Sequence, residues 1–175
     1  MLTAVCLLAW ALSAATPAHA SAGGLLDVTC TPPSSTVSTY TPPLTNTPQI
    51  SRSTISRQFG PCVSLSHPEV TSGTSSSVNA PRERSCLDLL GSGSSTITIT
   101  WNTGQTSTLS TNFTSTVAGA VVEAVGSGTV TSGLFQGDTV VMDMTGPATD
   151  ILLCTAGLGT VSSVYSTMVL ELTSV

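Results

Sequence analysis

Charged side chains are scarce in this sequence, and lysine is absent from it. Charged residues make up 7% of the chain, against about 25% in an average soluble domain. The four basic residues are all arginine, and nine acidic residues leave a formal net charge of −5. Binding to a nucleic-acid backbone draws on many Lys and Arg contacts, so we expect no nucleic-acid partner. The same balance argues against electrostatic adsorption to a membrane.

Histidine is scarce as well, which limits acid–base and nucleophilic catalysis. His67 is the single histidine after residue 20, and it directly precedes a proline, a position typical of a turn or the start of a strand. A catalytic interpretation would pair His67 with Glu69 or a distant Asp, but no G-x-S-x-G nucleophile motif is present. We therefore interpret His67 as an exposed loop residue.

The few carboxylates form no recognisable catalytic or metal-binding pattern. Asp138 and Asp143 are an odd number of residues apart, so on a regular strand they point to opposite faces. Calcium would need a ligand loop, and the carboxylates of Asp138, Asp143 and Asp150 lie outside any D-x-D-x-D-G motif. Glycines in GSGS (91–94) and GSGT (126–129) are followed by no helix or lysine and indicate turns or bulges. We assign no catalytic, cofactor-binding or metal-binding residue, and we expect no cofactor.

Residues 1–20 are predicted to be a signal peptide. An apolar run ends in Ala18-His19-Ala20, which has the small-x-small form that signal peptidase cleaves. No basic residue precedes the run, so the true start codon could lie upstream. The run falls short of the ~20 apolar residues that a membrane span needs. We therefore expect no stable membrane anchor, and a single secreted, extracellular domain over residues 21–175.

Removal of the signal peptide would also remove Cys6 and leave an even number of cysteines. Cys30, Cys62, Cys86 and Cys154 would then lie in an oxidising compartment, where two disulfides are expected. Four cysteines allow three pairings, and the sequence does not choose among them. We prefer Cys30 with Cys62, joining neighbouring strands, and Cys86 with Cys154, closing a long loop. A cysteine metal site is disfavoured because no C-x-x-C motif is present.

Alternating, β-branched segments dominate the rest of the chain and predict an all-β fold. We expect about eight antiparallel strands that form a β-sandwich or a small β-barrel, stabilised by the two disulfides. The predicted strands include 36–41, 48–56, 69–79, 96–101, 117–125, 127–135, 139–145 and 164–173, with a returning strand after the turn at 102–104. A short helical turn is possible at 118–125 and at 149–157, the second with Asp150 as its cap.

The segment TITITWNTGQTSTLST (96–111) shows the alternation most clearly. Ile97, Ile99 and Trp101 share one face, which we predict to be the core face, while the threonines between them face outward. In the same way, Met142 and Met144 share a face of the segment GDTVVMDMT. An outward threonine array could recognise a regular neutral lattice, but we favour the simpler role of keeping an almost uncharged β-protein in solution.

Five segments are distinctive: TYTPPLTNTP, FGPCVS, CLDLLGSGSSTITITWNTGQTSTL, GTVTSGLFQGDTVV and LLCTAGLGTV. With them the chain resembles a group of small secreted proteins from actinobacteria, the streptomycetes and their relatives, and the similarity covers nearly the whole of residues 21–175. The resemblance implies export, the disulfides and an all-β fold. It implies no activity and no catalytic residue.

The sequence leaves three hypotheses for function. The first is a secreted, non-catalytic structural or binding protein, whose partner could be a neutral cell-wall or extracellular polymer. The second is a small barrel that carries an apolar ligand, for which a pocket lined by Met142, Met144 and Trp101 would be the sign. The third is an enzyme of unknown type, for which polar groups converging on His67 would be the sign.

Overall fold

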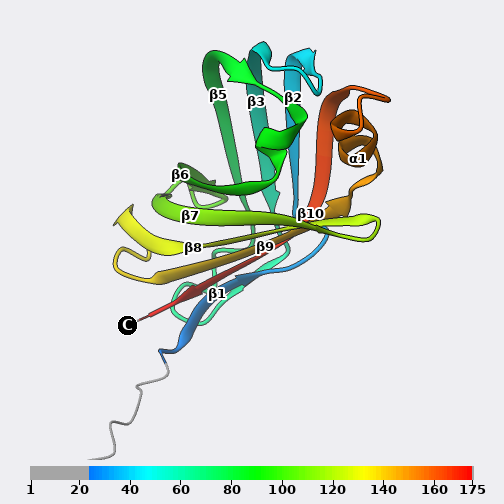
Figure 1. Cartoon of the computed structure of the whole chain (residues 1–175). Helices are drawn as coiled ribbons and strands as arrows, with labels where there is room; N and C mark the ends of the chain where they lie inside the picture. Colours follow the sequence, from blue (N-terminus) through cyan, green and yellow to red (C-terminus); the bar gives the residue numbers. More distant parts are fainter. Residues whose placement is uncertain (1–23, 175) are drawn as a thin grey trace, which may run out of the picture.

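The computed structural model describes residues 24–174, and these form a closed antiparallel β-barrel (Figure 1). The predicted signal peptide, residues 1–20, lies outside the described residues. Eight strands make the barrel wall, and two short strands, β1 and β4, extend the sheet at one end. Of the two architectures left open by the sequence, the barrel is therefore the correct one. Among the described residues, no helix is both long and apolar enough to cross a bilayer.

The elements follow one another along the chain with short connections. The strands are β1 (Leu26–Cys30), β2 (Ser35–Leu44), β3 (Gln49–Phe59), β4 (Cys62–Ser64), β5 (Gly73–Arg84), β6 (Gly91–Trp101), β7 (Thr106–Ala118), β8 (Val121–Gly133), β9 (Thr139–Pro147) and β10 (Val161–Thr173). A 3-10 turn η1 (Cys86–Leu89) and a short helix α1 (Thr149–Thr155) complete the fold.

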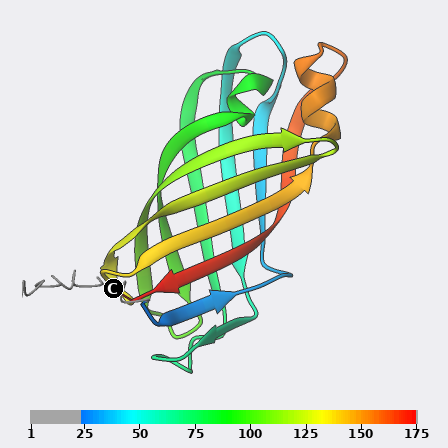
Figure 2. The same cartoon turned by 60° about the horizontal axis from the view of Figure 1, so that its bottom comes forward.

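The barrel closes because β2 pairs with both of its neighbours. Its Val37 lies opposite Ser56 of β3 on one side and opposite Tyr165 of β10 on the other. The other strands of the wall pair in the order in which they occur in the chain, except that β4, which follows β3, is not part of the wall. Every pairing is antiparallel. The strands slant strongly around the barrel axis (Figure 2), as closure of a small barrel requires.

The prediction of separate strands at 117–125 and 127–135 was wrong. Residues 121–133 form the single strand β8, and the turn that precedes it falls at Gly119, whose φ of 64° favours glycine. Gly126 and Gly128 pair regularly with β7 and β9 and make neither a turn nor a bulge. The helical turn at 149–157 is present as α1, but Ala148 occupies the N-cap position and Asp150 lies within the first turn.

Apolar side chains gather in two clusters, one at each end of the barrel. The floor cluster lies at the end where β1 and β4 are attached and is built around Trp101, with Phe59, Ile97, Ile99, Leu109, Phe135, Met168, Leu170 and Leu172 among its members. Ile97, Ile99 and Trp101 are buried while Thr96, Thr98 and Thr100 are exposed, so the predicted core face is confirmed. Gly73 packs against the Trp101 ring so closely that a Cβ atom would lie 2.8 Å from it.

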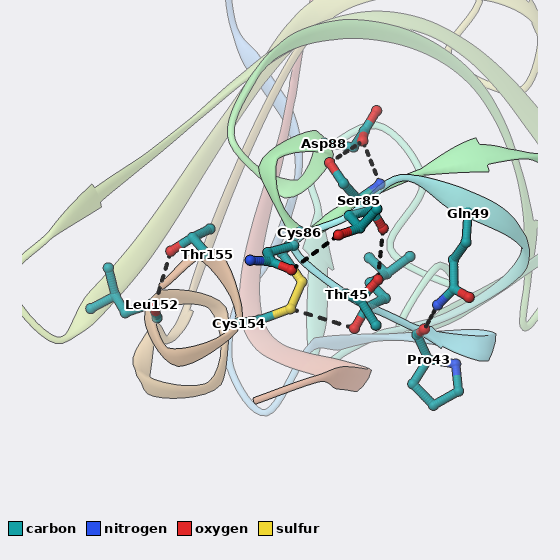
Figure 3. Close-up of a disulfide and its surroundings, with 12 residues drawn as sticks. Pro43, Thr45, Gln49, Ser85, Cys86, Asp88, Leu152, Cys154 and Thr155 are labelled. Carbon is teal, nitrogen blue, oxygen red and sulfur yellow. Dashed lines mark hydrogen bonds between the residues drawn. A yellow bond between two sulfur atoms is a disulfide. The ribbon is translucent and has the colours of Figure 1, made fainter. Parts of the chain in front are cut away.

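The cap cluster closes the other end with η1 and α1. Its buried members are Leu44, Cys86, Val122, Ala148, Ile151, Cys154 and Val161. The Cys86–Cys154 disulfide joins η1 to α1, and the Cys154 sulfur lies 3.4 Å from the Leu44 carbonyl oxygen (Figure 3). The Cys86 amide donates a hydrogen bond to the Thr45 carbonyl oxygen at 2.9 Å. The disulfide therefore ties the cap to the end of β2.

Both preferred disulfide pairings are confirmed. Cys30 is bonded to Cys62, and the two residues face each other where β1 pairs with β4. The Cys86–Cys154 bond spans 68 residues of sequence. The two disulfides are consistent with a non-reducing environment.

Candidate ligand-binding cavity

A cavity of about 660 Å³ lies inside the barrel between the floor cluster and the cap cluster. All eight barrel strands contribute inward-facing residues to it, because alternate side chains of each strand point toward the axis. Met142 and Met144 of β9 line this space as a pair, whereas Trp101 lies below it in the floor cluster. The sequence therefore predicted two of the three pocket residues that would indicate a ligand carrier.

The cavity wall is mixed rather than apolar. Its apolar part includes Ile55, Ile97, Met142, Met144, Val164 and Val122. Its uncharged polar part includes the hydroxyl and amide groups of Thr36, Ser38, Ser53, Ser77, Asn79 and Ser166. The Asn79 amide donates a hydrogen bond to the Ser53 hydroxyl at 2.9 Å, which fixes both side chains against the wall. A ligand in this cavity would thus meet both apolar surface and hydrogen-bonding groups.

Arg57 on β3 points into this cavity and is 9% exposed. Its cross-strand neighbours are Thr36 on β2 and Ser75 on β5, neither of which carries a charge. The buried Nε atom has no hydrogen-bond partner, and none of the ion pairs among residues 24–174 involves this side chain. Burial lowers the pKa of the Arg57 guanidinium, but arginine keeps its proton in proteins. An uncompensated cation therefore lines the lumen.

Arg82 and Arg84 bring two further positive charges to the edge of the same cavity. Asp88 is the single acidic residue among the lining residues, and its carboxylate accepts hydrogen bonds from the Ser85 amide at 2.7 Å and the Ser85 hydroxyl at 3.0 Å. Desolvation raises the pKa of Asp88, but the Ser85 hydrogen bonds and the two arginines outweigh it and lower that pKa. The lining therefore carries three cations and one anion in a protein of net charge −5.

The cavity opens through the side of the barrel between β5 and β6. These strands pair only where Gly73 faces Trp101 and Thr74 faces Thr100, whereas the adjacent pair β6 and β7 stays in register from Gly91 to Thr100. Above this short pairing the strands diverge, and consecutive residues of each strand line the cavity, 79–82 on β5 and 94–97 on β6. Inward-facing and outward-facing residues of both strands therefore border the cavity. The gap between the two strands is a lateral opening.

A second hollow of about 650 Å³ lies outside this opening. Five residues line only the outer hollow: Leu87, Leu90, Gly91, Ser92 and Gly93. Five others line both spaces: Arg82, Asp88, Leu89, Ser94 and Phe113. The two hollows therefore adjoin each other at these residues. The 3-10 turn η1, anchored by Cys86, borders both of them.

His67 lies apart from the cavity, in the loop between β4 and β5. Its Nδ1 atom is 3.1 Å from Glu69 Oε1, and its side chain is 39% exposed. The ring packs edge-on against Phe135, with ring centroids 5.3 Å apart. The pairing with Glu69 that a catalytic interpretation requires is present, but neither residue lines the cavity. The loop position predicted for His67 is confirmed, but the residue is partly buried rather than exposed.

The carboxylate predictions have a mixed outcome. Asp143 is exposed on β9 and Asp150 is exposed on α1. Among residues 24–174, no group of three or more potential metal ligands is present. Asp138, by contrast, is 6% exposed, its Oδ2 atom is buried without a hydrogen-bond partner, and its carboxyl lies near that of Asp27 on β1. The odd spacing of Asp138 and Asp143 in the sequence argued against a joint role for these two residues. It gave no sign of the contact between Asp138 and Asp27, which depends on the tertiary fold.

Burial of Asp138, together with the adjacent Asp27 carboxylate, raises the Asp138 pKa from 3.8 to about 6. The folded protein therefore binds a proton more tightly than the unfolded chain between these two pH values. This contribution to stability is complete below pH 3.8 and is lost as the pH rises through about 6.

We expect Asp138→Asn to reduce the pH dependence of the unfolding free energy. As the pH rises from 4 to 7.5, the unfolding free energy of the variant should increase by on the order of 1 to 2 kcal/mol relative to that of the unsubstituted protein, after allowance for solvent screening. Urea denaturation at the two pH values measures the effect. Asp143→Asn, an exposed change on the following strand, is the matched control. An unchanged pH slope in Asp138→Asn would contradict the assignment.

The outward threonines form a hydroxylated face on β6 and β7. Thr98 and Thr108 face each other across the two strands with their hydroxyl oxygens 3.4 Å apart, and Ser92 and Thr114 do so at 3.3 Å. The face belongs to a curved, closed wall (Figure 2). Matching a flat lattice needs a flat array, so this curvature favours a role in solubility.

Comparison of the chain with family models, curated proteins and solved structures found no match. The class of site is therefore defined by geometry alone: a mixed polar and apolar cavity in an eight-stranded barrel with a side opening.

Proposed function

We propose that this protein is a non-catalytic binding protein that holds a small molecule inside its barrel. The observation that carries the proposal is the cavity of about 660 Å³, which is bounded at both ends by packed clusters and opens at one side. Binding sites for small molecules commonly measure about 300 to 1,000 Å³ and combine apolar walls with a few polar groups. The cavity meets both criteria.

The ligand that suits this wall is amphipathic. The second hypothesis from the sequence was a carrier of an apolar ligand, and Met142, Met144 and Val164 provide apolar contacts for part of a ligand. Against a purely apolar ligand, the hydroxyl groups and arginines along the rest of the wall would lose hydrogen bonds to water and form none in exchange. A ligand with a polar or charged end supplies the missing hydrogen bonds.

We further propose that the protein acts after export, in the extracellular medium. The two disulfides support this proposal because such bonds persist in oxidising compartments. The signal peptide and the resemblance to secreted actinobacterial proteins stay predictions. A polymer-binding role has less support because the threonine face is curved, and an enzymatic role has less because His67 and Glu69 lie away from the cavity.

The proposal is tested with N-phenyl-1-naphthylamine, an uncharged probe that fluoresces in apolar surroundings. Ala124→Phe introduces a phenyl ring at an inward-facing position of the cavity wall. We expect the oxidised protein to bind the probe and this variant to bind it at least about tenfold more weakly, because the ring fills part of the cavity.

Val125→Phe is the matched control, since it introduces the same phenyl ring at the next residue of β8, where the side chain is 49% exposed. This control should bind the probe as the unsubstituted protein does. Circular dichroism confirms that both variants fold. Absence of probe binding, or equal binding by the two variants, would contradict a lumenal site.

A further inference from the structure

We propose that the lumenal site selects anionic amphiphiles, with Arg57 binding the anionic group and the apolar wall holding the chain or ring system. This inference rests on the proposed lumenal binding function and names the ligand class for it. The ligand is identified by its chemistry, a single carboxylate, sulfate or sulfonate attached to an apolar body.

The first argument is the state of Arg57. Arg57 is 9% exposed and its Nε atom is buried without a hydrogen-bond partner, whereas buried cations are normally paired with carboxylates. The residues opposite Arg57 on both sides, Thr36 and Ser75, are uncharged, and its neighbours along the inward face of β3 are Ile55 and Phe59. None of these neighbours supplies a counter-charge, and a ligand anion would provide one.

The second argument is the distribution of charge over the whole chain. Of the four basic residues, Arg57, Arg82 and Arg84 line the cavity, whereas eight of the nine acidic residues do not. The Arg84 Nε atom is also buried without a hydrogen-bond partner. Although the net charge is −5, three of the four positive charges therefore lie at the lateral opening or in the lumen. Such a distribution attracts anions to the opening despite the overall charge.

The third argument is the spacing of charge and apolar surface. Arg82 and Arg84 lie toward the end of β5 beside the lateral opening, and Arg57 lies on the adjacent strand within the lumen. Met142, Met144 and Val164 come from β9 and β10, so apolar wall is available on other strands of the same cavity. An anion can contact the outer arginines on entering and Arg57 once bound. A guanidinium suits carboxylate, sulfate and sulfonate because it offers several N–H donors in a planar fork.

Two probes that differ in one group test this selectivity. The anionic probe is 8-anilinonaphthalene-1-sulfonate, and the neutral probe is N-phenyl-1-naphthylamine, which has the same ring system without the sulfonate. Arg57→Gln removes the charge. We expect this variant to bind the sulfonate probe at least about tenfold more weakly, since hydrogen bonds to charged groups are the stronger class. Its affinity for the neutral probe should stay within about twofold.

Arg52→Gln is the matched control. Arg52 lies on the same strand but is exposed, so the same change of charge there should alter neither affinity. Binding of the neutral probe by Arg57→Gln also shows that the lumen is intact. Unchanged sulfonate affinity, or equal weakening for both probes, overturns the anion proposal while the lumenal site stands. Failure of both probes to bind the unsubstituted protein overturns the binding function itself.

Competition on the unsubstituted protein gives a result that does not depend on any variant. Decanoate and decan-1-ol have chains of equal length and differ in charge. We expect decanoate to displace the sulfonate probe at an at least about tenfold lower concentration than decan-1-ol does. Displacement at equal concentrations would overturn the proposal.

Discussion

Replacement of both Cys86 and Cys154 by alanine should lower the free energy of unfolding by about 4 kcal/mol. The bond closes a loop of 68 residues, and in the chain-entropy description its removal releases a large number of unfolded conformations. Both cysteines are fully buried in the cap cluster, so the substitutions also remove packing. Urea denaturation of the oxidised proteins measures the loss.

The double substitution of Cys30 and Cys62 provides a comparison at the other end of the barrel. Its loop is shorter, with a separation of 32 residues, so the chain-entropy loss should be smaller by about 0.7 kcal/mol. Loss of the Cys86 bond should also weaken binding of N-phenyl-1-naphthylamine, because η1 borders the lateral opening. Equal denaturation midpoints for the oxidised and reduced unsubstituted protein would contradict any stabilising role for either bond.

Replacement of Trp101 by alanine should lower the free energy of unfolding by about 3 to 5 kcal/mol. The Trp101 ring is 2% exposed at the centre of the floor cluster, and it packs near Phe59 and Phe135 with centroid distances of 6.4 and 5.8 Å. Its Nε1 atom donates a hydrogen bond to the buried Ser107 hydroxyl at 2.8 Å. The substitution therefore creates a cavity and leaves a buried hydroxyl with one partner fewer.

Trp101→Phe separates these two contributions. Phenylalanine keeps much of the aromatic packing but removes the donor, so we expect about half of the alanine effect or less. The measurement is again urea denaturation, followed by circular dichroism. A loss below about 1 kcal/mol for Trp101→Ala would contradict the placement of this ring in the core.

The sequence was a good guide to local structure. The alternation of Ile97, Ile99 and Trp101 with threonines identified the buried face correctly, because a strand has a fixed period of two. The turn after Trp101 was also predicted, and Gly104 there has a φ of 84°. The disulfide pairing was chosen correctly, although nothing in the cysteine spacing alone required it.

The sequence was a poor guide where tertiary pairing decides the outcome. Glycine is a usual turn residue, so Gly126 and Gly128 suggested a break within β8 that pairing with β7 and β9 overrides. Closure of the barrel depends on the contact between β2 and β10, which are more than 100 residues apart in the chain. No local pattern records such a contact.

The cavity residues were largely missed, and one signal was available. Ile55, Arg57 and Phe59 lie at alternate positions of β3, so a core face defined by Ile55 and Phe59 also contains Arg57. An arginine at an inward position of a strand is unusual and indicates either a buried ion pair or a binding site. The absence of a partner could be established only from the fold, since it depends on what β2 and β5 place opposite.

The most direct measurement is a crystal structure of the oxidised protein with 8-anilinonaphthalene-1-sulfonate bound. The result predicted by a lumenal anion site is density for the probe between the floor and cap clusters, with the sulfonate oxygens within about 3 Å of the Arg57 guanidinium. Density for the probe on the outer wall alone, with the lumen occupied by water around Arg57, would contradict it.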